Sequence, residues 1–276
     1  MKKYILLLLL SIHGHAENSE ERFFKDKNAH ANGFGLHTDL GYSSYLIELD
    51  SSELNSAIDY DVLEFTLGTT YSYEKWMVGL YGKFLVDELN SNMFVVTTAE
   101  KLGDHANIDK NEFGVYLNYT LAENEESRWY LNAIYRYSRL EAKDSYKSFL
   151  SYQSSFDYET QGLAFSLGYF KSLNERSSWF GQAGLLYSLA KVKMSESVNG
   201  QLQDCFVDDT VNAIGKKVTV GYSYEMDREL FLVLRVDAWS VNFGALNVLS
   251  RVGDSLPKAT LNEHSFTTYT GVSWRF

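Results

Sequence analysis

The chain has 276 residues, with 25 Lys and Arg against 36 Asp and Glu and a formal net charge of -11. This acidic balance argues against a nucleic-acid-binding protein, because neutralising phosphates needs clustered basic side chains. A single Cys excludes an intramolecular disulfide and a Cys-rich metal site. A mean hydropathy of -0.25, with no second long apolar run, excludes a bundle of membrane-spanning helices.

The first sixteen residues have the tripartite pattern of a secretory signal peptide. Met1-Lys2-Lys3 is a positive start, residues 4–12 form a short apolar core, and Gly14-His15-Ala16 offers small residues for cleavage. An uncleaved membrane anchor is the alternative, but spanning a bilayer needs roughly 20 apolar residues. We therefore expect an exported protein whose mature chain begins near Glu17, with residues 17–32 as a periplasmic N-terminal segment.

From residue 34 onward, apolar and polar residues alternate with a period of two. This is the pattern of β-strands that have one apolar and one polar face. No segment with a helical period competes with it. The alternation predicts ten strands, at residues 34–43, 63–73, 76–85, 112–121, 129–138, 162–169, 179–189, 217–225, 230–238 and 266–276.

The connections between these strands alternate between short and long. The short ones are residues 74–75, 123–128, 174–178 and 226–229, and the long polar ones are 50–56, 88–110, 143–157, 195–212 and 250–263. An up-and-down meander trimmed at one end has this pattern, and bacterial outer-membrane barrels place short turns in the periplasm and long loops outside. The predicted fold class is all-β, a transmembrane antiparallel barrel of about ten strands over residues 33–276.

The direction of the apolar face separates a membrane barrel from a soluble sandwich or barrel, whose apolar face points inward. Segments of about ten residues with aromatic residues beside the short turns favour the membrane barrel. The predicted aromatic girdle consists of Tyr73, Trp76, Tyr119, Trp129, Tyr169, Trp179, Tyr224 and Trp274. The polar faces carry charges of both signs that can pair inside a lumen: His37, Asp39, Glu64, Lys83, Glu112, Arg136, Lys217, Glu225, Arg235 and Asp237.

The last strand carries a recognisable end. It reads Tyr269-Thr270-Gly271-Val272-Ser273-Trp274-Arg275-Phe276, with alternating apolar residues Val272, Trp274 and Phe276. This resembles the assembly signal of Gram-negative outer-membrane barrels, without pointing to a subfamily. The resemblance implies a multi-pass protein of the cell outer membrane, recognised by the barrel assembly machinery and in contact with outer-membrane lipid and lipopolysaccharide.

Two non-enzymatic hypotheses follow from the strand number. About eight strands leave an interior filled by side chains, and 16–18 leave an open channel. The first hypothesis is therefore an integral membrane protein with a mostly occluded polar lumen and a structural or surface-interaction role, with an extracellular ligand bound through its loops. The second is a narrow, porin-like channel for small solutes. We predict no cofactor and no metal, because the acids of residues 50–61 lack EF-hand spacing. The role of Cys205 stays open.

A surface hydrolase is the third hypothesis. Ten strands is also the number in the omptin surface proteases, whose family pattern is a pair of Asp residues near one loop and an Asp-His couple near another. Asp87-Glu88 and Asp104-His105 resemble parts of it, but the later loop has Asp204, Asp208 and Asp209 without the His that a general base requires. Glu263-His264-Ser265 resembles the acid, His and Ser of outer-membrane lipid-A deacylases, yet adjacent strand residues face opposite sides. No catalytic residue is assigned.

Overall fold

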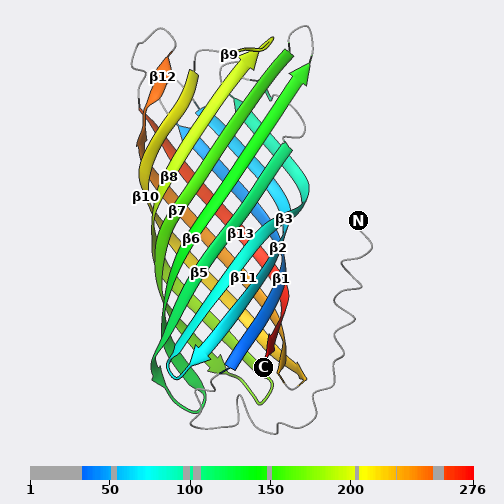
Figure 1. The fold of residues 1–276 in the computed structure, drawn as a ribbon, viewed down its shortest axis with the longest axis vertical. Coiled ribbons are helices and arrows are strands. Elements are labelled where there is room, and N and C mark those ends of the chain that lie inside the picture. Colours follow the sequence, from blue (N-terminus) through cyan, green and yellow to red (C-terminus); the bar gives the residue numbers. More distant parts are fainter. Residues whose placement is uncertain are drawn as a thin grey trace.

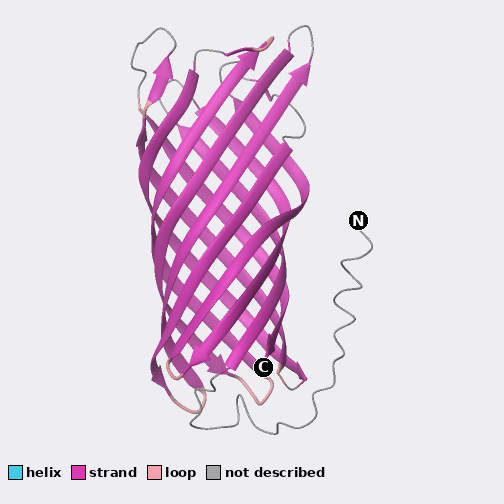
Figure 2. Cartoon of the chain, in the orientation of Figure 1, coloured by secondary structure: helices cyan, strands magenta, loops and turns pink. Residues whose placement is uncertain are grey.

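The structure is a computed structural model that describes residues 33–50, 55–95, 100–101, 107–147, 151–202, 205–227, 229–250 and 258–276. The predicted signal peptide and N-terminal segment, residues 1–32, lie outside the described residues. All regular structure in the described part is strand (Figure 2). Within it, no helix is long and apolar enough to cross a membrane.

Ten long antiparallel strands form one closed barrel (Figure 1). The ring closes because the last long strand pairs with the first along sixteen positions. The long strands are β1 (Gly33–Asp50), β2 (Asn55–Tyr73), β3 (Trp76–Val95), β5 (Asn107–Glu123), β6 (Ser127–Lys147), β7 (Ser151–Ser172), β8 (Ser177–Val198), β10 (Cys205–Asp227), β11 (Leu230–Leu246) and β13 (Ala259–Arg275). The predicted up-and-down barrel is confirmed.

Three short strands prolong the barrel at one end, which we call the loop end; the other is the turn end. They are β4 (Glu100–Lys101), β9 (Gln201–Leu202) and β12 (Val248–Ser250), paired with β3, β8 and β10 respectively. The turn end holds the short connections 74–75, 124–126 and 173–176. The first and last described residues, Gly33 and Phe276, also lie at the turn end (Figure 1).

The strands are strongly tilted, because the pairing register is staggered around the barrel. Following paired residues from Leu46 on β1 through all ten long strands leads back to β1 at Phe34, twelve residues earlier. A shear of this size in a ten-strand barrel corresponds to a tilt of about 40°. The visible slant of the strands agrees with this register (Figure 1).

The strands are longer than the sequence analysis predicted. They run over 17 to 23 residues, and most of the predicted loop at 143–157 belongs to β6 and β7. The predicted ranges were too short because the alternation of apolar and polar residues continues beyond them with the two faces exchanged. In these extensions the apolar side chains face inward and the polar side chains face outward. On β6, Leu140 and Ala142 face inward, while Arg139, Glu141 and Lys143 face outward.

The half of the barrel near the turn end has an apolar outer surface. On β8 this exposed band runs from Trp179 to Leu189, close to the 9–11 residues that a tilted strand needs to cross a bilayer. The border of this band at the turn end is lined by aromatic side chains. Ring centroids lie 4.4 Å apart for Trp76 and Tyr119 and 4.6 Å apart for Trp129 and Tyr169. The other predicted girdle residues, Tyr73, Trp179, Tyr224 and Trp274, lie on the same outer surface.

The half near the loop end has the inverse arrangement. Its lumen is filled by a hydrophobic core that includes Tyr60, Leu140, Leu186, Leu246 and Leu261. The outer surface carries charges instead. A polar outer wall around an apolar interior is the arrangement of a barrel in water. We therefore infer that this half extends out of the membrane, beyond the apolar band.

Candidate functional site in the barrel lumen

The lumen has three levels. A polar cavity lies at the turn end, ion pairs cross the middle, and the hydrophobic core fills the loop end. We call the middle level the charge layer, and it consists of Asp39, Glu64, Lys83, Lys110, Glu112, Arg136, Lys217, Arg235, Asp237 and Glu263. Its five acids and five bases balance, which is what a buried set of charges requires.

Glu64 on β2 is the most connected member of the charge layer. Its side chain is 1% exposed and accepts a 2.9 Å hydrogen bond from the Lys110 ammonium. Lys83 lies 3.8 Å from the same carboxylate, and the Tyr45 hydroxyl donates to it at 3.1 Å. The Lys110 ammonium also stands 3.3 Å from the centroid of the Tyr45 ring. Strands β1, β2, β3 and β5 are thereby joined through one carboxylate.

A second group lies on β3, β5, β6, β10 and β11. The Arg136 guanidinium is 3.6 Å from the Glu112 carboxylate, which also accepts a 2.9 Å hydrogen bond from the Tyr81 hydroxyl. Arg136 and Lys217 flank the ring of Trp239, at 4.3 and 4.5 Å from its centroid. These contacts place two cations against one indole in the interior of the barrel.

The third group forms the ceiling of the cavity. Arg235 on β11 lies 3.6 Å from Asp39 and 3.5 Å from Asp237. The ammonium of Lys83 donates a 2.8 Å hydrogen bond to the Tyr269 hydroxyl, and Arg235 lies over the Tyr269 ring. Side chains from β1, β3, β11 and β13 therefore meet in the lumen at this level.

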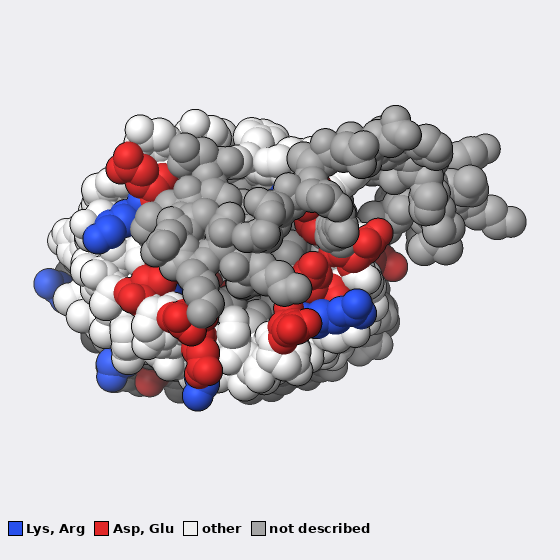
Figure 3. Space-filling view, turned by 90° about the horizontal axis from the view of Figure 1, so that it is seen from below, with Lys and Arg blue, Asp and Glu red and all other residues white. Residues whose placement is uncertain are grey.

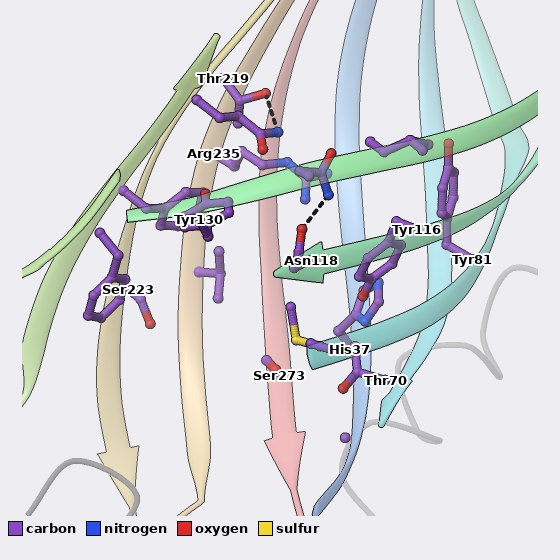
Figure 4. Close-up of a pocket in the computed structure, with 18 of the residues that line it drawn as sticks. His37, Thr70, Tyr81, Tyr116, Asn118, Tyr130, Thr219, Ser223, Arg235 and Ser273 are labelled. Carbon is purple, nitrogen blue, oxygen red and sulfur yellow. Dashed lines mark hydrogen bonds between the residues drawn. The ribbon is translucent and has the colours of Figure 1, made fainter. Parts of the chain in front are cut away.

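The cavity has a volume of about 930 Å³, and its lining extends from the turn end into the charge layer, where it includes Lys110, Arg136 and Glu263. Its lining reaches the short turns, at Glu74 and Asn124 for example, so the cavity opens at the turn end. The rim there carries both acidic and basic side chains (Figure 3). His37 on β1, Tyr116 and Asn118 on β5, Tyr130 on β6 and Arg235 on β11 lie around the cavity (Figure 4).

Large aromatic side chains fit into this narrow lumen because glycines face them from the neighbouring strand. A Cβ atom on Gly79 would overlap the Tyr116 ring, and one on Gly168 would overlap the Tyr130 ring. Tyr81 covers Gly114 in the same way. The lumen glycines thus provide the space that the tyrosine rings occupy against the wall.

The structure places the predicted lumen residues at different levels. His37 lines the cavity, and eight others belong to the charge layer. Glu225 differs: it lines a small separate pocket beside the turn at 173–176. Sequence analysis missed Lys110 and Glu263, because both were assigned to loops. The continuing alternation around them was the signal that placed them on inner faces.

The residues considered for hydrolysis do not form a cluster in the described part of the chain. Asp87 and Asp208 are exposed, and Asp209 binds the Asn247 amide at 2.9 Å. Asp104, His105 and Asp204 lie outside the described residues. At the third candidate, Glu263 and Ser265 face the lumen while His264 is exposed on the outer wall. Among the described residues, no three His, Cys, Asp or Glu side chains gather as metal ligands.

Comparisons with known proteins identify barrels of the outer membrane. The family model "Autotransporter beta-domain" matches residues 40–194. The structure of the outer membrane protease OmpT from Escherichia coli superposes with a TM-score of 0.65 and 14% identity, over 88% of this chain and 97% of OmpT. The translocator domain of the autotransporter NalP from Neisseria meningitidis gives 0.50 and 11%, over 91% and 90%. At these identities the likeness concerns the fold. No curated protein sequence matches the chain significantly.

Proposed function

The chain belongs to the autotransporter β-domain family, and we propose that it is a closed outer-membrane barrel that does not conduct solutes and that presents its extracellular half as an interaction surface. The chain is located in the outer membrane, with its short turns in the periplasm. The observation that carries the proposal is the inversion of hydrophobicity halfway along the strands.

Closure rests on the packing of the extracellular half. Tyr60, Leu140 and Leu261 are each at most 1% exposed, although they come from β2, β6 and β13. Side chains in such a core pack at the density of organic crystals and leave no continuous path for water. A solute entering from the periplasm would also meet the charge layer, where every cation lies near an anion or an aromatic ring.

The surface role rests on the outer wall of the same half. Arg139 contacts Glu141 on its own strand and lies 3.7 Å from both Asp157 and Glu159 on β7. Lys143 lies 3.3 Å from Glu141. These charges stand on paired strands, so their positions are fixed before a partner arrives. A rigid patterned surface of this kind favours specific recognition.

The channel hypothesis remains the alternative, and conductance distinguishes the two. Refolded protein is incorporated into planar lipid bilayers, and heat-modifiable migration in gels establishes that the barrel is folded. The proposal expects no discrete openings at any applied voltage. Reproducible single-channel steps from the folded protein would contradict closure and would make the charge layer the selectivity filter.

Variants that remove one charge distinguish ion passage through the lumen from leakage around the barrel. Were steps observed, Arg136→Gln would alter their ion selectivity if ions pass through the charge layer, whereas Arg139→Gln on the outer wall would leave it unchanged. Steps insensitive to both variants would come from lipid defects around the barrel. The hydrolase hypothesis gains no support from the described residues, since the OmpT likeness concerns the fold alone.

A further inference from the structure

The periplasmic cavity is used by no part of the proposed function. It is blind, because the charge layer and the hydrophobic core close it toward the outside. Its volume of about 930 Å³ falls in the range of small-molecule sites. A blind cavity of this size conducts nothing, but it can hold a ligand that enters from the periplasm.

Two phenol groups point into the cavity from fixed positions (Figure 4). The rings of Tyr116 and Tyr130 lie over Gly79 and Gly168 on the neighbouring strands. Within the described part of the chain, neither hydroxyl makes a hydrogen bond to another residue. Each is therefore available as both donor and acceptor, in a place that the wall has already set.

Three amide side chains continue this polar lining. Asn132 and Asn118 are hydrogen-bonded to each other across β5 and β6, and Ser166 donates to Asn132 at 3.3 Å. Further around the wall, the Gln182 amide on β8 donates to Thr219 on β10 at 3.2 Å. Each amide is thereby oriented while some of its four hydrogen-bonding positions remain unused.

The ceiling contains unsatisfied acceptors. Asp39 is 6% exposed and Thr66 is 4% exposed, and the two are cross-strand neighbours on β1 and β2. Among the described residues, Oγ1 of Thr66 and Oδ2 of Asp39 make no hydrogen bond, although Oδ2 of Asp39 lies 3.6 Å from the Arg235 guanidinium. Both atoms are enclosed by protein, so they add to the polarity of the ceiling but are not themselves contact points for a ligand in the cavity. Arg235, 3.6 Å from Asp39, balances the charge there.

We propose that this cavity binds a neutral, hydroxyl-rich saccharide from the periplasm. Donors and acceptors are interleaved along its walls, as a polyhydroxylated ligand requires, and rings of Tyr116 and Tyr130 offer apolar surface between them. The paired charges of Asp39 and Arg235 leave no net charge to attract an ion. A peptide fits less well, because its regularly spaced backbone groups prefer a strand edge, and a closed barrel has none.

Saturation-transfer NMR tests the site with defined probes. The full-length mature chain is refolded in lauryldimethylamine oxide micelles, which carry no sugar headgroup to compete. The probes are N,N′-diacetylchitobiose and maltose, with trialanine as a peptide probe. The double variant Tyr116→Phe/Tyr130→Phe removes both free hydroxyls and keeps the rings. The matched control is Tyr71→Phe/Tyr222→Phe, which alters two tyrosines on the lipid-facing surface.

The expected result is transfer to at least one saccharide that falls at least about threefold in the cavity variant, in line with the loss of one or two hydrogen bonds, and is unchanged in the control. No transfer to either saccharide would overturn the proposal. So would transfer that both variants leave intact, or variant-sensitive transfer to trialanine alone. Conductance is measured on the same preparation, so that a failure of this site is distinguishable from a failure of closure.

Discussion

The carboxylate of Glu64 on β2 binds the ammonium of Lys110 on β5 at 2.9 Å, although β3 lies between these strands in the sheet. The two side chains meet because both point into the lumen, over the inner face of β3. Lys83 of β3 lies 3.8 Å from the same carboxylate. One acid thus compensates two cations, and the barrel wall is braced from inside rather than only through its ladder of backbone bonds.

Removing the Glu64 charge is expected to destabilise the barrel. Glu64→Gln leaves Lys110 and Lys83 without their shared anion, and breaking a buried pair costs about 3–5 kcal/mol. Reversible urea unfolding in micelles, followed by tryptophan fluorescence, measures the change. Glu141→Gln, which removes a partly exposed ion-pair partner on the outer wall, serves as control and should change stability by less than about 1 kcal/mol. Adding Lys110→Met to Glu64→Gln should restore part of the loss; no restoration would disprove the pairing.

Gly184 is expected to tolerate no side chain. A Cβ there would lie 2.7 Å from the Cα atom of Ser166 on β7 and would also overlap the carbonyl oxygen of Phe165, and backbone atoms cannot swing away. We expect Gly184→Ala to cost about 1–3 kcal/mol through overpacking. On the same strand, a Cβ on Gly181 would make only ordinary van der Waals contacts, with Trp179 at 3.5 Å and the Thr219 carbonyl at 3.7 Å, so Gly181→Ala is the control. Equal unfolding midpoints for the two variants would contradict this account.

Asp144 gives the half of the barrel near the loop end a pH dependence. Burial raises the pKa of its carboxyl above the usual 3.8, against the opposing hydrogen bond from the Ser145 backbone. An acid with a raised folded pKa binds its proton more tightly when folded, so its protonation stabilises the barrel and this stability is lost as pH rises through the folded pKa.

The matching experiment compares wild type with Asp144→Asn. The variant should be the more stable at neutral pH, and its advantage should shrink as pH falls through the interval between the raised pKa and about 3.8. Paired urea titrations across this range measure the difference, which cancels the contributions of other acids. A constant difference at all pH values would show that Asp144 does not titrate as stated.

Side-chain exposure predicts which positions can be labelled from outside the cell. Lys193 lies on the outer wall near the loop end, and Ser223 lies inside near the turn end. With the native Cys205 changed to Ser, Lys193→Cys should react with a membrane-impermeant maleimide on intact cells. Ser223→Cys should react only after the outer membrane is permeabilised. Labelling of Ser223→Cys on intact cells would contradict the orientation or the closure.

The C-terminal residue is expected to matter more for assembly than for stability. The Phe276 amide donates a 2.8 Å hydrogen bond to the Phe34 carbonyl, and its ring lies 4.8 Å from that of Trp274 on the outer surface. We propose that the barrel assembly machinery reads these aromatic residues. Phe276→Ala should therefore lower the amount in isolated outer membranes several-fold. The same variant refolded from urea should form the barrel normally, and Phe266→Ala is the control for losing a lipid-facing ring.

Sequence periodicity by itself determined the strands in the half of the barrel near the turn end. Alternation over residues 76–85 and 179–189 was enough to predict the strands, their lipid-facing sides and the short turns between them, because a strand with one apolar face must show a period of two. Aromatic residues beside those turns marked the interface for the same local reason. The number of strands followed from counting these segments.

Tertiary structure alone decided what fills the lumen. Lys110, Glu263 and Trp239 carry no local signal of partnership, since their contacts come from strands distant in sequence. The apolar residues also move from the outer to the inner face along the strands, as at Leu140 and Ala142. Only the closed barrel shows that these inward-facing residues form one core. Alternation is a property of each strand, whereas the environment of a face depends on the membrane level at which the whole barrel places it.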